Sequence, residues 1–347
     1  MRILITGGAG LVGSHCAEFF ALENQKNKII VLDNLMRSQL FGYNKKSVEF
    51  NWEYLKKFKN IERIKGDVRN DRDVTKAIGK GVDVLIHTAG QPGVISSVNK
   101  PKEDFSINAF GTLNVLEAAR KKSKDAVVIY TSTNKIYGEN VDKITLVEQE
   151  KRYTFKDVAG VSESISVDLT GHTPYGVSKL AGDLYTQEYA HIYGMKTGVF
   201  RCSCIYGTRQ FGFEDQGWVA WFIIATLFNK PIAIYGNGKQ VRDMLYVDDL
   251  VDAFNCFINS KLKNAVFNIG GGPGNTVSLL ELLEQLEKLT GKKPKVKFTD
   301  WRPSDQKVYI TDLTKIQSHL NWRPKIPVSS GIKKLIDWVR QNKEYFV

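Results

Sequence analysis

Two residues one helical turn apart, Tyr175 and Lys179, offer the clearest chemistry in this sequence. They occur in the stretch PYGVSKLAGDLY, where Pro174 suits the first turn of a helix. Residues i and i+4 of a helix are neighbours, so the Lys179 ammonium would lie close to the Tyr175 phenol. Free tyrosine has a pKa of about 10, and a nearby cation lowers that pKa by stabilising the phenolate. The pair therefore predicts a tyrosine that takes up and returns a proton near neutral pH.

The same spacing occurs a second time, at Tyr235 and Lys239. A Gly-Asn-Gly sequence lies between these two residues and favours a turn, so their side chains need not share a face. A surface tyrosine and lysine one turn apart is also the ordinary explanation for the first pair. What favours catalysis at Tyr175 is a cofactor motif at the start of the chain.

That motif is the glycine-rich stretch TGGAGLVG, which follows an apolar strand pattern and precedes an apolar helix pattern. It contains Gly7, Gly8, Gly10 and Gly13, which satisfy both G-x-x-G-x-x-G and G-x-G-x-x-G. A missing Cβ lets the backbone approach a pyrophosphate, and the first turn of the helix offers free N–H groups to it. A tight turn that merely needs glycine is the alternative, and the strand–loop–helix context argues against it.

Asp33 strengthens this interpretation because it ends the second predicted strand, 20 residues after Gly13. A carboxylate at that point accepts hydrogen bonds from the adenosine ribose of a dinucleotide. It also repels a 2′-phosphate, so NAD is favoured over NADP. The sequence therefore predicts NAD as the cofactor.

The elements that must position these residues alternate from the start of the chain. Apolar β-rich runs occur at RILIT, KIIVLD, VDVLIH, AVVIYTS and KTGVFRCSCIYG, with helical patterns between them. This alternation predicts an α/β fold with a doubly wound parallel sheet, the Rossmann plan. After about residue 206 the pattern changes to an aromatic-rich segment and a smaller α/β unit. We expect residues 1–205 plus about 240–262 to form an NAD-binding domain, and about 206–239 plus 263–347 to form a substrate-binding lobe.

Composition narrows the possible partners of this 347-residue chain. Its formal charge is +12, from 49 Lys+Arg against 37 Asp+Glu, but the basic residues are scattered. A solvated basic surface or attraction for small anions therefore explains the charge better than nucleic-acid binding. The four cysteines lack the paired spacing of a zinc site, and no metal is expected. No signal peptide or membrane-spanning run is recognisable, so we expect a cytoplasmic protein without a membrane partner.

Taken together, these residues resemble the extended short-chain dehydrogenase/reductase family, in particular its NAD-dependent sugar-nucleotide epimerases and dehydratases. The resemblance covers essentially the whole chain. It rests on residues that fall at family positions in family order, namely the glycine loop, Asp33, Gly66-Asp67-Val68, Ala89-Gly90-Gln91, Asn108, Thr133, Tyr175 and Lys179.

The resemblance implies a role for each matching position. The catalytic residues would be Tyr175 as the base, Lys179 as its partner and Thr133 as a hydrogen-bond donor to the reacting sugar oxygen. The NAD-binding residues would be Gly7, Gly10, Leu11, Val12, Gly13, Asp33, Asn34, Ser38, Asp67, Val68, Thr88, Ala89, Gln91, Asn108, Thr131, Tyr175 and Lys179. A nucleotide-diphosphate sugar would contact Gln91, Thr133, Asn134, Cys204, Arg209, Gln216, Arg242 and Arg302, with the two last-named arginines on its phosphates.

Two departures from the wider family narrow the activity. Family members that eliminate water usually carry Asp-Glu after the threonine, whereas TSTNKIYG has Asn134 and Lys135, which do not suit those acid and base roles. Common 4-epimerases carry Asn where this chain has Cys204. Together with Arg209-Gln-Phe211, Asp215-Gln-Gly-Trp218 and the stretch GNGKQVRD, these features are most similar to the CDP-paratose (CDP-tyvelose) 2-epimerases.

The resulting hypothesis is an epimerase that oxidises a nucleotide-diphosphate sugar to a keto-sugar and reduces it again on the opposite face, with NAD as the resident cofactor. One alternative keeps the chemistry but acts at carbon 4 of a UDP-sugar. A non-catalytic dinucleotide-binding or redox-sensing protein is an alternative of another class. Arg242 and Arg302 could instead pair with nearby acids such as Asp243 or Asp305. The resemblance further implies a homo-oligomer, either a dimer or a tetramer.

Overall fold

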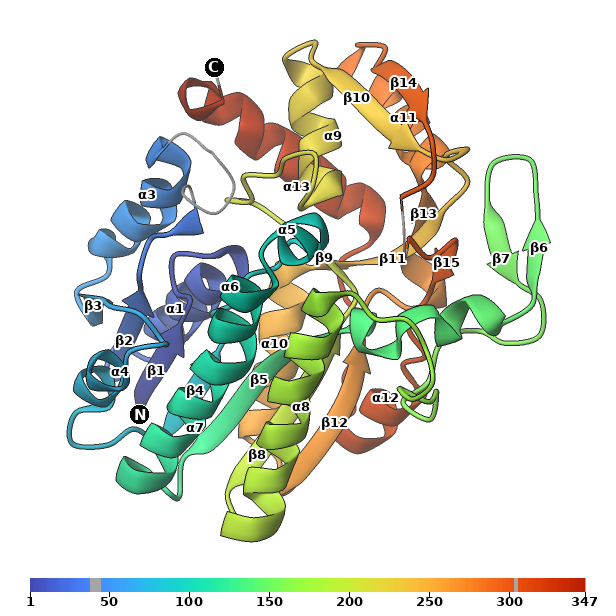
Figure 1. Cartoon of the computed structure of the whole chain (residues 1–347). Helices are drawn as coiled ribbons and strands as arrows, with labels where there is room; N and C mark the ends of the chain where they lie inside the picture. The colour runs from blue at the N-terminus through green and yellow to red at the C-terminus, as the bar shows by residue number, and fades with distance from the viewer. Residues whose placement is uncertain (38–44, 303–304, 347) are drawn as a thin grey trace. The chain divides into compact units, whose positions relative to one another are not determined.

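A seven-stranded sheet forms the centre of the first part of the chain in the computed structural model, which describes residues 1–37, 45–302 and 305–346. Its strand order is β12-β8-β5-β4-β1-β2-β3, and the pairs β1–β2, β2–β3, β1–β4 and β4–β5 are parallel (Figure 1). The strands are β1 (Arg2–Thr6), β2 (Lys28–Asp33), β3 (Ile61–Lys65), β4 (Val84–His87), β5 (Val127–Thr133), β8 (Lys196–Cys202) and β12 (Asn264–Ile269).

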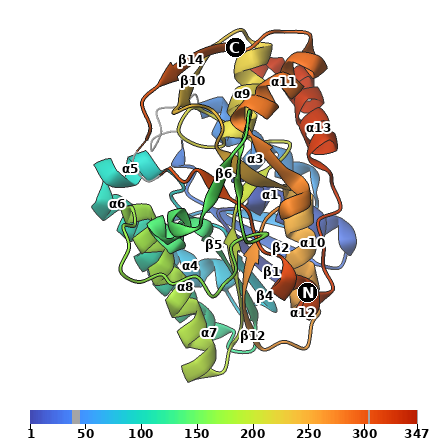
Figure 2. The ribbon, with the colours of Figure 1, turned by 90° about the vertical axis from the view of Figure 1, so that its right-hand side faces the viewer.

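Helices cover both faces of this sheet. One face carries α4 (Asp71–Ile78), α7 (Gly111–Lys122) and α8 (Pro174–Tyr193), and the other carries α1 (Leu11–Glu23) and α10 (Val247–Ile258) (Figure 2). Successive strand residues point to opposite faces, so strands covered on both sides are apolar throughout. β4, for example, is buried at every position. The predicted doubly wound parallel plan is confirmed.

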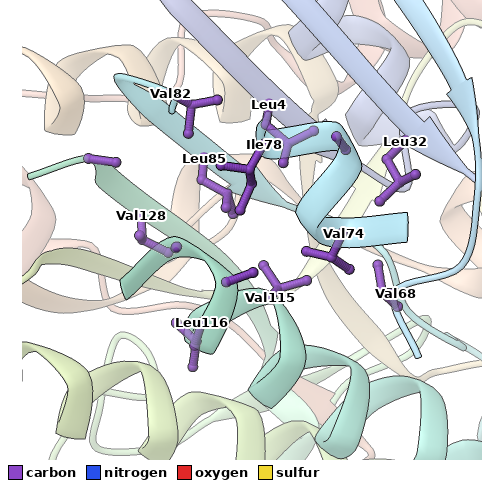
Figure 3. Close-up of a cluster of buried hydrophobic side chains, with 14 of the residues drawn as sticks. Leu4, Leu32, Val68, Val74, Ile78, Val82, Leu85, Val115, Leu116 and Val128 are labelled. Atoms are coloured by element: carbon purple, nitrogen blue, oxygen red, sulfur yellow. The ribbon is translucent and has the colours of Figure 1, made fainter. Parts of the chain in front are cut away.

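The core on the α4–α7–α8 face shows how the sheet holds these helices. Its side chains come from β1, β2, β4 and β5 on one side and from α4 and α7 on the other (Figure 3). Burying each of these Val, Leu and Ile side chains contributes about 1.5–3 kcal/mol. Those labelled in the figure are Leu4, Leu32, Val68, Val74, Ile78, Val82, Leu85, Val115, Leu116 and Val128.

Three short helical segments lead into α7, namely α5 (Val94–Asn99), α6 (Pro101–Phe105) and the π-helical segment η2 (Ser106–Phe110). The other helical elements of the first part are α3 (Lys45–Tyr54) and η1 (Leu55–Lys57).

The second part of the chain contains small sheets. Strands β10 (Pro231–Tyr235) and β14 (Lys295–Thr299) pair in parallel, while β11 (Val241–Tyr246) pairs with β13 (Thr276–Ser278), β15 (Val308–Tyr309) and β9 (Cys204–Tyr206). The hairpin of β6 (Leu146–Glu148) and β7 (Tyr153–Phe155) follows the 3₁₀ segment η3 (Asn134–Lys143). The remaining elements are α9 (Trp218–Leu227), η4 (Pro273–Asn275), α11 (Leu279–Thr290), α12 (Thr314–Leu320), α13 (Val328–Gln341) and η5 (Lys343–Tyr345).

The chain forms two compact units whose boundaries differ from those expected. The first contains Met1–Thr133, Thr173–Arg201 and Val251–Phe267, and the second contains Asn134–His172, Cys202–Leu250 and Asn268–Val347. Residues 134–172 thus fall in the second unit, although the sequence pattern placed them in the first. Contacts made by this segment explain the difference, because Gln306 Nε2 donates to the Gly138 carbonyl oxygen at 3.0 Å and Asn268 N donates to Glu163 at 2.7 Å.

One predicted strand is wrong. The sequence suggested a continuous strand through KTGVFRCSCIYG, with Cys202 and Cys204 buried on one face. The strand instead ends at Cys202, and Cys204 begins β9, which pairs with β11. Ser203 donates its backbone N–H to the Ile269 carbonyl at 2.8 Å and its hydroxyl to Asp243, which redirects the chain. Both thiols are half-buried.

No helix in the described ranges is long and apolar enough to cross a membrane. Within those same ranges, no group of three or more His, Cys, Asp or Glu side chains is placed as metal ligands would be.

Candidate active site

The glycine loop between β1 and α1 is closely packed at three of its glycines, Gly7, Gly8 and Gly13. Gly7 has a φ of +69°, and its N–H donates to the Leu32 carbonyl at 2.8 Å. A Cβ on Gly13 would lie 2.3 Å from the Gly7 oxygen, so the loop and the helix could not pack as they do. Gly13 is therefore required by the packing of the loop itself.

Gly10 differs because the packing leaves room at it. It is the N-cap residue of α1 and has no side chain to bond the first turn, so the N–H groups of Leu11 and Val12 lie at an uncapped helix start. A Cβ on Gly10 would meet only the Gly7 oxygen, at 3.1 Å. The open space and the exposed N–H groups fit the pyrophosphate of a dinucleotide.

Asp33 lies beside this loop at the carboxyl end of β2. Its carboxylate accepts hydrogen bonds from the Ala9 N–H at 2.9 Å and the Leu35 N–H at 2.8 Å. Burial raises the pKa of Asp33, and the two backbone N–H groups oppose that rise. The carboxylate is therefore held at the loop with acceptor capacity left for ribose hydroxyls.

The residues predicted for the adenosine end lie together around Asp67. Asn34 Nδ2 donates to Asp67 Oδ2 at 2.9 Å, and Arg69 pairs with the same carboxylate at 2.6 Å. Burial opposes ionisation of Asp67, but hydrogen bonds from Arg69 and Asn34 outweigh it and lower its pKa. Val68 is buried beside Asp67. Ser38 lies outside the described residues.

The segment after β4 packs against the glycine loop and then forms a pair of buried hydrogen bonds between Gln91 and Asn108. Thr88 Oγ1 donates to the Thr6 carbonyl at 2.7 Å, and the Ala89 backbone packs against Gly7. Gln91 N donates to Asn108 Oδ1 at 2.8 Å, and Asn108 Nδ2 donates back to the Gln91 carbonyl at 3.0 Å. These two hydrogen bonds attach the turn after β4 to the segment η2, which contains Asn108.

His87 ends β4 and is structural, as its position suggested. Its ring nitrogens bond the Thr6 hydroxyl at 2.6 Å and the Thr112 hydroxyl at 2.9 Å. Thr112 donates its own proton to the Asn108 carbonyl, so His87 Nε2 carries the ring hydrogen. Burial and the Lys179 charge lower the pKa of His87 to about 3, which keeps the ring neutral.

The Tyr175–Lys179 pair lies on the first turns of α8, with Pro174 at its start as predicted. The Thr173 side chain caps the helix by accepting from the Gly176 N–H, and Tyr175 N donates to Ser97 Oγ at 3.1 Å. Lys179 is only 5% exposed, and its Nζ lies 4.2 Å from the centre of the Tyr130 ring. A buried ammonium is thereby held within one helical turn of Tyr175, the tyrosine predicted to react.

The predicted threonines occupy the carboxyl end of β5 in the same unit. Thr133 is the last residue of this strand and is buried. Thr131 Oγ1 donates to the His87 carbonyl at 3.0 Å, which ties β5 to β4. The first unit thus brings together, within its own fold, every described residue that was predicted to be catalytic or to bind NAD.

The second unit holds the two predicted phosphate-binding arginines. Arg242 Nη2 pairs with Asp305 Oδ1 at 2.7 Å, as the alternative interpretation foresaw. Arg302 pairs with Asp215 at 3.2 Å and stacks over the Tyr235 ring at 3.7 Å. An open pocket of about 430 Å³ adjoins Arg302 and the Asp305 partner of Arg242, and it is lined by Glu139, Asp142, Leu146, Trp301, Arg302, Asp305 and Lys307. Partly exposed guanidinium groups whose acid partners are also exposed suit an anionic ligand.

Lys135 belongs to this charged cluster. Burial and the neighbouring Arg242 guanidinium lower the pKa of Lys135 to about 8, while Asp305 and Asp142 act in the opposite direction. Asn134, the residue before it, is buried and donates to Gln306 Oε1 at 3.5 Å. The two residues at the positions of the dehydratases' Asp-Glu are therefore a buried amide and a lysine whose charged neighbours include Arg242.

Cys204, Arg209 and Gln216 also lie in the second unit, whereas the predicted substrate residues Gln91 and Thr133 belong to the first. Burial raises the pKa of the Cys204 thiol to about 12, so it stays protonated. Arg209 is buried and has a φ of +61°, a strained conformation for a residue with a side chain. Gln216 exchanges backbone hydrogen bonds with Phe213 at 3.0 and 3.1 Å, forming the turn before α9.

The sequence did not reveal three buried residues around Lys179, namely Asp104, Tyr130 and Ser178. Tyr130 lies under the Lys179 ammonium, Ser178 Oγ accepts from Asn108 Nδ2 at 3.1 Å, and Asp104 Oδ1 accepts from the same amide at 3.0 Å. The only available signal was spacing, since Asp104 is four residues before Asn108 on a helical stretch.

Known proteins resemble this chain over its full length. The model of the NAD dependent epimerase/dehydratase family matches residues 3–270. The chain is 43% identical to CDP-paratose 2-epimerase of Salmonella typhi, over 97% of this chain and 99% of that protein. It is 30% identical to UDP-glucuronate 4-epimerase of Thermodesulfobacterium geofontis, over 98% and 97% respectively. A crystal structure of UDP-glucuronic acid 4-epimerase from Bacillus cereus, in complex with UDP-glucuronic acid and NAD, is similar with a TM-score of 0.82 at 28% identity, covering 99% of this chain and 100% of that one.

Proposed function

The chain belongs to the NAD dependent epimerase/dehydratase family, and we propose that it interconverts CDP-paratose and CDP-tyvelose by inverting carbon 2 of the sugar. The predicted family, NAD as cofactor and the class of activity, an NAD-dependent sugar-nucleotide epimerase, are confirmed by the family match and these relatives. The observation that carries the finer proposal is the 43% identity to a CDP-paratose 2-epimerase over almost the whole of both chains.

The proposed mechanism assigns the proton to Tyr175. Bound NAD supplies a reversible hydride acceptor. Tyr175, with its phenolate stabilised by Lys179, takes the proton of the carbon-2 hydroxyl as the sugar is oxidised, while Thr133 donates to the sugar oxygen. The keto-sugar then presents its other face, and Tyr175 returns the proton as the hydride comes back. Proton and hydride are both restored, so no net oxidation occurs.

The residues after Thr133 support epimerisation over elimination. Water loss needs an acid for the leaving oxygen and a base for the neighbouring proton. Asn134 has no proton to transfer in the ordinary pH range, and Lys135, with a pKa of about 8, is largely a cation at neutral pH. Arg242 and Arg302 would hold the diphosphate through planar forks, exchanging their present acid partners for phosphate oxygens.

A conversion assay tests this proposal. We expect the purified enzyme to turn CDP-paratose into CDP-tyvelose, followed by NMR of the sugar protons, without accumulation of NADH. UDP-glucose and UDP-glucuronate serve as comparison substrates, and titration with CDP and UDP reports the base preference. Unchanged CDP-paratose together with conversion of a UDP-sugar would instead establish a 4-epimerase, the activity named for two of the relatives.

We also propose that the enzyme is a homodimer that pairs through the outer face of α5, α6, η2 and α8. α5, α6 and α8 run together in the first unit (Figure 1), and this face exposes large apolar side chains. Single exposed apolar residues are normal, whereas a contiguous set marks an interface. The set comprises Ile95, Val98, Phe105, Phe110, Val177, Leu184 and Tyr185.

Replacing Leu184 by Glu should convert the dimer to a monomer, because the substitution puts a charge into the middle of an apolar interface. Leu184 is 52% exposed in the single chain. The matched control is Leu22→Glu, since Leu22 is 57% exposed but lies on α1. Light scattering on a sizing column measures the mass. A dimer that survives Leu184→Glu, or a parent that is already monomeric, would contradict the proposed interface.

A further inference from the structure

A buried carboxylate, Asp104, lies at the catalytic lysine and has no role in the mechanism above. It is on α6, one helical turn before Asn108, and is 1% exposed. Its Oδ1 accepts a hydrogen bond from Asn108 Nδ2 at 3.0 Å. Its Oδ2 is also buried and has no hydrogen-bond partner among the described residues. A residue that only anchored Asn108 would need one acceptor, so the second oxygen calls for another explanation.

Hydrogen bonds through Asn108 connect Asp104 with Ser178, the residue before Lys179. Asn108 Nδ2, which bonds Asp104, also donates to Ser178 Oγ at 3.1 Å, and Ser178 precedes Lys179 on α8. The Lys179 Nζ would lie 3.8 Å from a Cβ on Gly90. The Cβ of the same glycine would be 3.0 Å from Asn108 Oδ1. The ammonium therefore lies within about 7 Å of the oxygen of the amide whose nitrogen bonds Asp104.

Neither charge is stable there alone. The pKa of Asp104 is raised, because its burial outweighs the opposing effects of the Ser178 hydrogen bond, the Lys179 charge and the Asn108 hydrogen bond. An isolated ion costs several kcal/mol to bury, whereas an opposite charge and hydrogen bonds offset that cost. The two charges thus make each other tolerable inside the protein.

The other titratable groups around them cannot take over this role. His87 on β4 is neutral, and Tyr130 on β5 is a phenol whose pKa burial raises further. Asp183 on α8 is fully buried but pairs with Arg201 at 3.0 Å and accepts from Ser132 at 2.7 Å. Tyr175 is the reacting group itself. Asp104 is the remaining carboxylate in this part of the first unit.

We propose that Asp104 is the buried counter-ion of Lys179 and acts through it as a positioning residue for Tyr175. The role suits an epimerase, because Tyr175 must both take and return a proton, which works best when its affinity for the proton matches the working pH. The ammonium and the cationic nicotinamide ring of bound NAD would together hold Tyr175 as a permanent phenolate. The negative charge of Asp104 would offset part of the positive potential that these two cations produce at Tyr175. The proposal assumes the Tyr175 and Lys179 roles of the proposed function but not its sugar.

Asp104→Asn tests the charge while keeping an oxygen that can accept from Asn108. Removing an anion lowers the pKa of every neighbouring acid, so the Tyr175 phenol should ionise at a pH lower by about one unit. The measurement is the tyrosinate absorbance of the NAD-loaded protein during a pH titration, minus that of the Tyr175→Phe variant treated identically. It needs no substrate, so its result is independent of whether CDP-paratose is converted.

Two further variants complete the test. Asp104→Ser, also neutral, should give the same downward shift and covers the case in which Asp104→Asn does not fold. Asp104→Glu keeps the charge and should titrate like the parent. With a converted substrate, both limbs of the kcat/KM profile should move to lower pH in the neutral variants. A folded, NAD-loaded neutral variant with an unmoved Tyr175 titration would overturn the proposal and leave Asp104 as an anchor for Asn108.

Discussion

Replacing Tyr175 by Phe should lower kcat by about 10³-fold while NAD remains bound. In the proposed mechanism the phenol takes and returns the proton, and loss of a positioned general acid–base typically costs 10²–10⁴-fold. The ring itself stays, so the packing at the start of α8 is kept. Tyr175 is one of the residues predicted to bind NAD, but most of the others belong to the glycine loop, Asp33 and the Asp67 cluster, which the substitution does not touch.

The measurement is steady-state epimerisation together with NAD content of the purified protein. Tyr235→Phe is the matched control because it makes the same change in the second tyrosine–lysine pair of the sequence. Tyr235 donates to Glu214 at 2.9 Å and supports Arg302 with its ring, so that variant should retain kcat within about twofold, as exposed substitutions usually do. Full activity in Tyr175→Phe would remove this tyrosine from the mechanism.

Much of the cofactor half of the site could be predicted because its determinants are local in the sequence. The glycine loop, Asp33 and the Tyr175–Lys179 pair each depend on spacing within one strand–turn–helix unit. The Gly-Asn-Gly turn between Tyr235 and Lys239 was likewise correctly excluded as helical, since Gly236 and Gly238 have φ values of +82° and +78°.

What the sequence could not supply depends on contacts between distant residues. Nothing in PKEDFSIN marks Asp104 as buried, and its exposure to the charge of Lys179, 75 positions later, depends on tertiary packing. The end of β8 at Cys202 likewise depends on Ser203 bonding Asp243, 40 residues away. Residues 134–172 join the second unit through Gln306 and Asn268, and no local pattern records those contacts.

The predicted substrate-binding residues are harder to assign from sequence, because an arginine can serve either as an ion-pair partner or as a phosphate ligand. In the structure, Arg242 pairs with Asp305 and Arg302 pairs with Asp215. The exposed fraction of the acid partner distinguishes a structural ion pair from a phosphate-binding arginine better than the sequence does. Asp215 is 39% exposed, and screened pairs of this kind contribute little to stability, so a multiply charged ligand can displace them.

Two glycine variants in the loop after β1 should separate folding from cofactor binding. Gly10→Ala should fold normally yet weaken NAD binding by at least about 10²-fold, since its Cβ would occupy the space through which the pyrophosphate approaches the backbone. In the folded chain that methyl group would meet one close neighbour, the Gly7 oxygen at 3.1 Å, which a shift of a few tenths of an ångström would relieve. Gly13→Ala should lose stability of the fold as well as NAD binding, because its Cβ would lie 2.3 Å from the Gly7 oxygen and 2.7 Å from Gly8 Cα.

Thermal unfolding with and without added NAD distinguishes the two outcomes. A ligand that binds the native state stabilises it by RT ln(1 + [L]/Kd), so saturating NAD should raise the Tm of the parent by several degrees. Gly10→Ala should match the Tm of the NAD-free parent and respond little to NAD, whereas Gly13→Ala should melt lower even without ligand, since overpacking costs about 1–3 kcal/mol. If Gly10→Ala binds NAD as tightly as the parent, the pyrophosphate does not approach the backbone at this glycine, and the cofactor must enter the first unit differently from the way its loop geometry indicates.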